Sequence, residues 1–126
     1  MTTPITLATL EQATEQQVFD QVVAHLRKQG AKAKGSTGGF STSCVYRNDA
    51  GLKCAAGCLI GDDEYNKCME NKTWVGLVGK GFAPEKHCTL VTDLQRVHDR
   101  DPVEKWEDSL EAVASYHRLD YTPPEG

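Results

Sequence analysis

The chain lacks the features that define several large classes of protein. Its 126 residues contain no apolar run that approaches the roughly 20 residues of a membrane-spanning helix. The first residues, MTTPITLATL, lack the basic start and long apolar core of a secretory signal peptide. Hydrophobic residues make up 39% of the chain and charged residues 25%, which is typical of one globular domain. We therefore expect a cytoplasmic protein of the bacterial or host cytosol, with no membrane partner.

Motifs for binding nucleotides or nucleic acids are also missing. The stretch GSTGGFST, from Gly35 to Thr42, lacks the Gly-Lys-Ser/Thr ending of a phosphate-binding loop. There is no zinc finger, no aromatic RNA-binding strand and no helix with a row of basic residues, and the formal net charge is −4. We expect no nucleic-acid partner. Residues 31–43 indicate a flexible Gly/Ser loop, although Lys32 and Lys34 leave a weak anion site open.

The five cysteines do not form a regular zinc or disulfide pattern. An odd number in a reducing cytosol favours free thiols over a disulfide framework. Cys44, Cys54, Cys58 and His98 are the candidate metal ligands, because thiolate and imidazole groups suit zinc. However, Cys54 and Cys58 are four residues apart, and no second close pair follows at the usual distance. The sequence therefore favours no cofactor, and a structural zinc is the alternative.

A cysteine nucleophile is a second chemical alternative. Cys58 follows a glycine at the junction of two expected elements, and His87 or His98 is available as a base. Nothing in the sequence fixes their geometry, so we assign no catalytic residue.

Residues 44–65 contain the clearest hairpin signal. Residues 45–46 are β-prone, and Asn48 to Gly51 predict a type I turn closed by glycine. The small residues 55–57 allow another backbone or a large side chain to approach closely. The acidic triplet 62–64 indicates the first turn of a helix rather than a metal site.

Hydrophobic periodicity predicts four helices. The first begins after Thr14, which forms a capping box with Gln17, and ends at Gly30. The others are expected over residues 73–79, 84–100 and 102–114, the last two as an antiparallel pair.

These elements predict one α+β domain. A small antiparallel β-hairpin or sheet would pack against a layer of three to four helices in residues 1–120, and residues 121–126 would form a frayed tail. The segment from Arg27 to Lys53 carries six basic residues and one acid, which favours a contact surface there. The candidate binding residues are Arg47, Asn48, Lys53, Phe40 and Tyr46.

A longer pattern runs through the same region. Cys-x-Tyr-Arg begins at Cys44, Gly-Leu-Lys-Cys-Ala-Ala-Gly-Cys-Leu-Ile-x-Asp-x-x-Tyr ends at Tyr65, and Leu-Gln-x-x-His-Asp ends at Asp99. This pattern resembles a group of small uncharacterised proteins encoded by bacteriophages and prophages, over most of residues 44–119. The resemblance implies no activity. It implies a small cytosolic phage product, often an accessory protein that acts on host machinery or host defence.

We therefore expect a small non-enzymatic binding or accessory protein of phage origin. Its partner would be a host protein, in host takeover or anti-defence, and a homodimer is a further option for its assembly. The alternative function is a small enzyme or zinc-stabilised module built on the cysteines and histidines.

Overall fold

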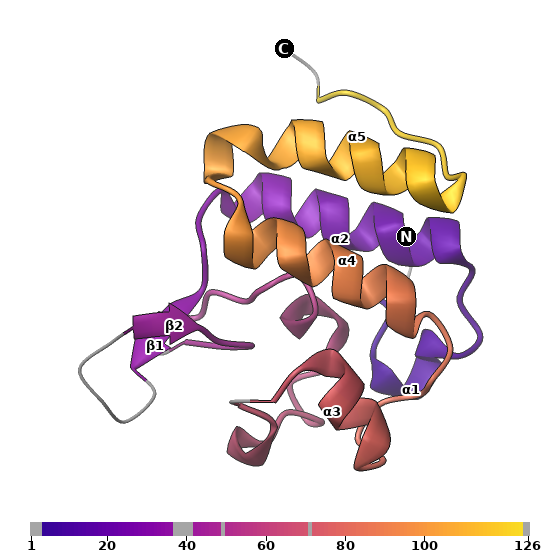
Figure 1. Cartoon of the computed structure of the whole chain (residues 1–126). Coiled ribbons are helices and arrows are strands. Elements are labelled where there is room, and N and C mark those ends of the chain that lie inside the picture. The colour runs from indigo at the N-terminus through magenta and orange to yellow at the C-terminus, as the bar shows by residue number, and fades with distance from the viewer. Residues whose placement is uncertain (1–3, 37–41, 49, 71, 125–126) are drawn as a thin grey trace.

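Helices dominate the fold. The computed structural model describes residues 4–36, 42–48, 50–70 and 72–124 (Figure 1). The α-helices are α1 (Leu7–Leu10), α2 (Glu15–Gln29), α3 (Trp74–Gly79), α4 (Cys88–Arg100) and α5 (Trp106–His117). The short elements are strands β1 (Lys34–Ser36) and β2 (Thr42–Cys44), and 3₁₀ turns Gly57–Leu59, Lys67–Met69 and Val103–Lys105.

The long helix α4 is the centre of the packing. It contacts α2, α3 and α5, and α5 runs back along it as the predicted antiparallel partner (Figure 1). Its apolar face enters a core built mostly from helical side chains. The largest fully buried side chains include Phe19, Leu10, Leu26, Leu59, Ile60, Leu77, Leu90, Leu94, Leu110 and His98.

The predicted limits of the first long helix are confirmed. The Thr14 hydroxyl accepts a hydrogen bond from the Gln17 backbone, and the Gln17 side chain accepts one from the Thr14 backbone. Gly30 ends the helix in the left-handed conformation, with φ of 61°. The later starts differ, since α4 begins at Cys88 rather than near residue 84, and a 3₁₀ turn precedes α5.

The expected α+β architecture is wrong, because the domain is helical. Strands β1 and β2 pair in antiparallel register as a ribbon of three residues each, which lies beside the helices and forms no layer over them (Figure 1). The hairpin expected within residues 44–54 has its turn, since the Gly51 N–H donates to the Asn48 carbonyl. Its two arms, however, share only the bridge between Arg47 and Lys53 among the described residues.

Side chains explain why this hairpin does not form a ladder. The backbone N–H of Tyr46 donates to the Glu70 carboxylate at 2.9 Å. The Cys54 carbonyl, which would accept this N–H in a longer ladder, accepts the Cys58 N–H instead. On the outer edge of the other arm, the Gln29 amide bonds the N–H and the carbonyl of Lys53, at 2.9 and 2.7 Å. Because these backbone groups have other partners, they need no neighbouring strand. The β-prone residues therefore run as an extended segment between helices.

The expected close approach at residues 55–57 is confirmed. A Cβ atom on Gly57 would lie 2.2 Å from the Tyr46 carbonyl oxygen. Ala55 and Ala56 have no exposed surface. The extended segment and the first 3₁₀ turn can therefore pack together only because these residues are small.

The acidic triplet serves a different helix from the one expected. Residues 61–65 form a turn, and the Glu64 carboxylate accepts the backbone N–H groups of Leu7 and Ala8, each at 2.9 Å. Glu64 thus caps the start of α1 from a distant part of the sequence. Asp62 lies 2.9 Å from Arg47 in an ion pair.

The end of the described chain contacts α2 and α5. The Arg27 guanidinium bonds the Glu107 carboxylate at 2.8 Å and the Thr122 carbonyl at 2.7 Å. The Tyr121 hydroxyl donates to the same carboxylate at 2.8 Å. These contacts hold residues 121 and 122 against the helices. Within the described ranges, no helix combines the length and the apolar character that crossing a bilayer requires.

The Gly57 contact can be tested by adding a single methyl group. We expect Gly57→Ala to lower the free energy of unfolding by about 2 kcal/mol, because the Tyr46 backbone must move to admit the Cβ atom. Gly79→Ala is the matched control, since nothing lies within 4 Å of its Cβ position. Urea denaturation measures both. Equal stabilities of the two variants would contradict the close approach.

Candidate functional site

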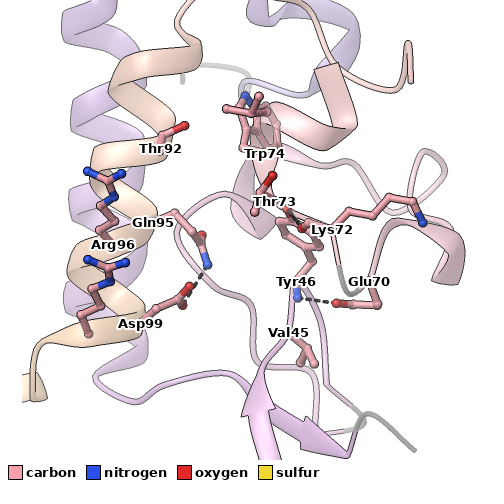
Figure 2. Close-up of a pocket in the computed structure, with 12 residues that line it drawn as sticks. Val45, Tyr46, Glu70, Lys72, Thr73, Trp74, Thr92, Gln95, Arg96 and Asp99 are labelled. Carbon is pink, nitrogen blue, oxygen red and sulfur yellow. Dashed lines mark hydrogen bonds between the residues drawn. The ribbon is translucent and has the colours of Figure 1, made fainter. Parts of the chain in front are cut away.

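A cleft lies between α4 and the segment that leads into α3 (Figure 2). Its volume is about 500 Å³, which is within the range of ligand-binding clefts. The residues that line it are Val45, Tyr46, Glu70, Lys72, Thr73, Trp74, Val75, Thr92, Gln95, Arg96, Asp99 and Arg100.

One wall is a polar stripe on α4. The stripe residues are Thr92, Gln95, Arg96, Asp99 and Arg100, spaced by three or four positions so that they share one helix face. The neighbouring face carries the apolar residues that enter the core. The helix therefore fixes the polar side chains through the burial of its other side.

The opposite wall is held by hydrogen bonds. The Tyr46 hydroxyl donates to the Lys72 carbonyl at 2.7 Å, and burial raises the pKa of this tyrosine. Thr73 caps α3, since its hydroxyl accepts the Gly76 N–H at 3.0 Å. The wall is thus ordered without a ligand.

The carboxylates of the cleft already have partners within the fold. Glu70 accepts the Tyr65 hydroxyl at 2.6 Å and the backbone N–H of Arg47 at 3.2 Å. It also accepts the backbone N–H of Tyr46 (Figure 2). Asp99 accepts the Gln95 amide at 2.9 Å and the ring of His98 at 2.7 Å. These negative charges are therefore engaged by donors of the protein.

The cations of the cleft are less engaged. The Arg96 side chain is 61% exposed, and its guanidinium is 3.9 Å from Asp93, a weak surface pair. The Arg100 side chain makes no hydrogen bond or ion pair within the described residues. The Lys72 ammonium contacts the Cys68 carbonyl but no carboxylate of the described chain. The Lys72 ammonium points away from α4, so the cations that the cleft offers are Arg96 and Arg100 (Figure 2). Both carboxylates of the cleft already have donors within the fold, which favours an added anionic ligand at the two arginines.

Two buried polar atoms at the cleft have no hydrogen-bond partner among the described residues. They are the indole nitrogen of Trp74, whose residue is 2% exposed, and the hydroxyl of Thr92. Figure 2 shows Thr92 on the side of α4 that faces Trp74. An unpaired buried donor costs about 1–3 kcal/mol, which an acceptor entering the cleft would recover. Both atoms belong to residues that line the cleft, one on each wall.

The cysteines of the central segment are protonated thiols. Burial raises the pKa of Cys54, whose sulfur accepts the Gly57 N–H at 3.2 Å. Burial also raises the pKa of Cys58 to about 12, and its thiol donates to the Ala55 carbonyl at 3.1 Å. A thiol with such a pKa is a poor nucleophile at neutral pH. The geometry thus gives no support to Cys58 as a catalytic group.

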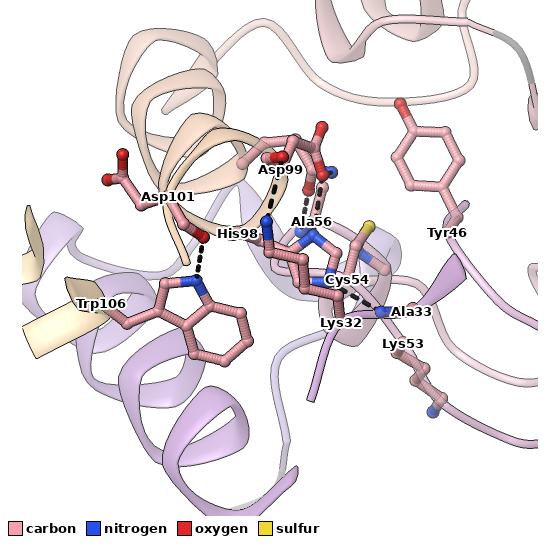
Figure 3. Close-up of polar contacts among 12 residues, drawn as sticks. Lys32, Ala33, Tyr46, Lys53, Cys54, Ala56, His98, Asp99, Asp101 and Trp106 are labelled. Atoms are coloured by element: carbon pink, nitrogen blue, oxygen red, sulfur yellow. Dashed lines mark hydrogen bonds and ion pairs between the residues drawn. The ribbon is translucent and has the colours of Figure 1, made fainter. Parts of the chain in front are cut away.

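His98 is a structural residue at the C-terminal end of α4. Its Nε2 atom accepts the Ala33 backbone N–H at 3.0 Å, so its proton is on Nδ1, which donates to Asp99 (Figure 3). The ring is 0% exposed and stacks on Trp106, with 5.7 Å between ring centres. Both nitrogens have partners, which leaves His98 no free position for a metal or a substrate.

His87, the other candidate base, is also bonded within the fold, and the candidate metal ligands do not gather among the described residues. The His87 ring bonds the Ala13 carbonyl at 2.7 Å. In the part of the chain that the structure describes, no group of three or more histidine, cysteine or acidic side chains gathers as a metal site. The side chain of Cys44 lies outside that part.

The structure places one of the predicted contact residues, Tyr46, in the cleft. Arg47 bonds the Ile60 carbonyl and pairs with Asp62, and Lys53 lies 3.5 Å from the same carboxylate. Asn48 organises its own turn, and Phe40 lies outside the described residues. The predicted contact residues did not include Arg96 and Arg100, the cations of α4 that line the cleft. The sequence signal that could have indicated them is the spacing of three and four positions between polar residues of this helix.

No protein-family model, curated protein or solved structure matches the chain.

A substitution can remove the hydrogen bonds of His98 while keeping a ring of similar size. We expect His98→Phe to keep the stacking on Trp106 but to lower the free energy of unfolding by about 2 kcal/mol, because the Ala33 N–H loses its buried acceptor. Urea denaturation measures the change. His117→Phe is the control, since its ring bonds a half-exposed aspartate at 2.8 Å rather than a buried backbone group. An equal loss in both variants would show that the buried acceptor has no special role.

Thiol reactivity tests the assignment of the cysteines. We expect iodoacetamide at neutral pH to label exposed Cys68 first and to leave Cys54 and Cys58 unmodified until the protein unfolds. Mass spectrometry of native and urea-treated protein locates the label. Rapid native labelling of Cys58 would reopen its role as a nucleophile.

Proposed function

We propose that the protein is a non-enzymatic binding protein whose cleft between α3 and α4 receives the carboxylates of a protein partner. One observation carries the proposal. Arg96 and Arg100 line one cleft in which the two carboxylates are already bonded within the fold. A partner carboxylate therefore meets unpaired positive charge, and the Trp74 and Thr92 donors are available to it.

An acidic protein segment fits the charge of the whole molecule better than a nucleic acid does. The chain has a formal net charge of −4, which repels a long polyanion. The two arginines of α4 are enough for one or two carboxylates, which present a compact charge. The arginines attract a carboxylate at contact distance, whereas salt screens the repulsion from acidic residues farther away on the surface.

The enzymatic alternative has less support. The thiols of Cys54 and Cys58 are protonated and hydrogen-bonded, and both ring nitrogens of His98 are occupied. None of these residues lines the cleft. The resemblance to small phage-encoded proteins would place the partner among host proteins, so host takeover or anti-defence is part of this proposal.

A displayed library of random dodecapeptides tests the proposal. We expect selection on the protein to enrich peptides that carry aspartate or glutamate at fixed positions. The double variant Arg96→Gln, Arg100→Gln should weaken their binding at least about tenfold, because the carboxylates lose their charge partners. Isothermal titration calorimetry of the selected peptides gives the affinities.

The control variant Lys28→Gln, Lys105→Gln removes the same charge from exposed positions outside the cleft and should bind the peptides normally. Peptides that bind both double variants equally would exclude the cleft as their site. A single-stranded oligonucleotide that competes through Arg96 and Arg100 would show that the partner class is wrong.

A further inference from the structure

A second cleft adjoins the first one. It has a volume of about 590 Å³ and lies among α3, the start of α4 and the end of α5. Val75 of α3 lines both clefts, so they adjoin at that residue. We call the two adjoining clefts together the groove along α4.

The floor of the groove is a single face of α4. Thr89 lines the second cleft, and Thr92 and Arg96 line the first, at successive spacings of three and four residues. Seven residues of helix between Thr89 and Arg96 span about 10 Å. An extended peptide covers this distance in about three residues.

The second cleft offers apolar contact rather than charge. Tyr116 is 77% exposed and Val75 is 59% exposed, and both line it. Its histidines are engaged elsewhere, since His117 bonds Asp93 at 2.8 Å and His87 bonds the Ala13 carbonyl. Large exposed apolar side chains that share a cleft are typical of a protein contact site.

Acidic side chains also line the second cleft. Glu15 and Glu85 do so, whereas Arg96 and Arg100 line the first cleft. The groove therefore carries two arginines at one end, beside carboxylates that are bonded within the fold, and is apolar with an acidic edge at the other. This charge difference attracts an acidic residue to the first cleft and repels it from the second, which fixes the direction of a bound segment.

We infer that the groove binds an extended segment of a partner protein that carries acidic residues at one end and a large apolar side chain about three residues away. This inference rests on the proposed function and adds a second contact to it. The acidic residues contact Arg96 and Arg100, and the apolar side chain packs between Val75 and Tyr116.

Immobilised peptides provide the test. Each peptide contains two adjacent aspartates in a polyserine chain, with one phenylalanine placed at successive distances on either side. We expect the phenylalanine to improve binding about tenfold when it lies about three residues from the aspartates, on one side only. Tyr116→Ser and Val75→Ser should each remove most of this gain but keep the dependence on the aspartates. Val103→Ser alters the other large exposed apolar residue of the described chain, outside both clefts, and should keep the gain.

The outcomes separate the two proposals. Binding that depends on the aspartates but gains nothing from phenylalanine, or a gain that Tyr116→Ser and Val75→Ser leave unchanged, would overturn the groove and leave the acidic site in place. Binding that ignores the aspartates would overturn both. A gain at one distance and on one side, lost in both variants, would support the groove.

Discussion

The hydrogen bonds of the buried His98 ring fix the part of the structure on which the cleft depends. Nε2 holds the backbone of Ala33, and Nδ1 holds Asp99. Asp99 in turn accepts from Gln95, whose other amide atom accepts the Ala56 N–H at 2.8 Å. One network therefore ties the end of α4 to the chain before β1 and to the small-residue segment (Figure 3). It also gives the Asp99 carboxylate hydrogen-bond donors within the fold.

Helix α4 packs into the core with one face and lines the cleft with another. One face supplies the core, and the other supplies the polar stripe with Arg96 and Arg100. Because the apolar face, Gln95 and Asp99 secure the helix, Arg96 and Arg100 are free to carry charges that contribute little to stability. Asp99 links the faces, since it lines the cleft and bonds the buried His98 ring.

Local patterns predicted the helices better than the architecture. The Thr14 cap, the Gly30 stop and the close approach at Gly57 depend on neighbouring residues, and all three are confirmed. The hairpin ladder stops because Glu70, distant in sequence, bonds the Tyr46 N–H that the other arm would have bonded, and Gln29 bonds the outer edge at Lys53. The cleft was missed for the same reason. Its walls come from residues 45–46, 70–75 and 92–100, and no periodicity reveals that these segments meet.

The use of side chains to bond the extended segment has a consequence for the order of folding. The Glu70 and Gln29 contacts each join residues 24 positions apart, to Tyr46 and Lys53 respectively. Such contacts form only after the intervening chain has closed, whereas the helices gain their hydrogen bonds locally. The wall that contains Tyr46 therefore assembles after the helices. A chain that has formed α2, α4 and α5 already displays the arginines of the stripe before the opposite side of the cleft exists.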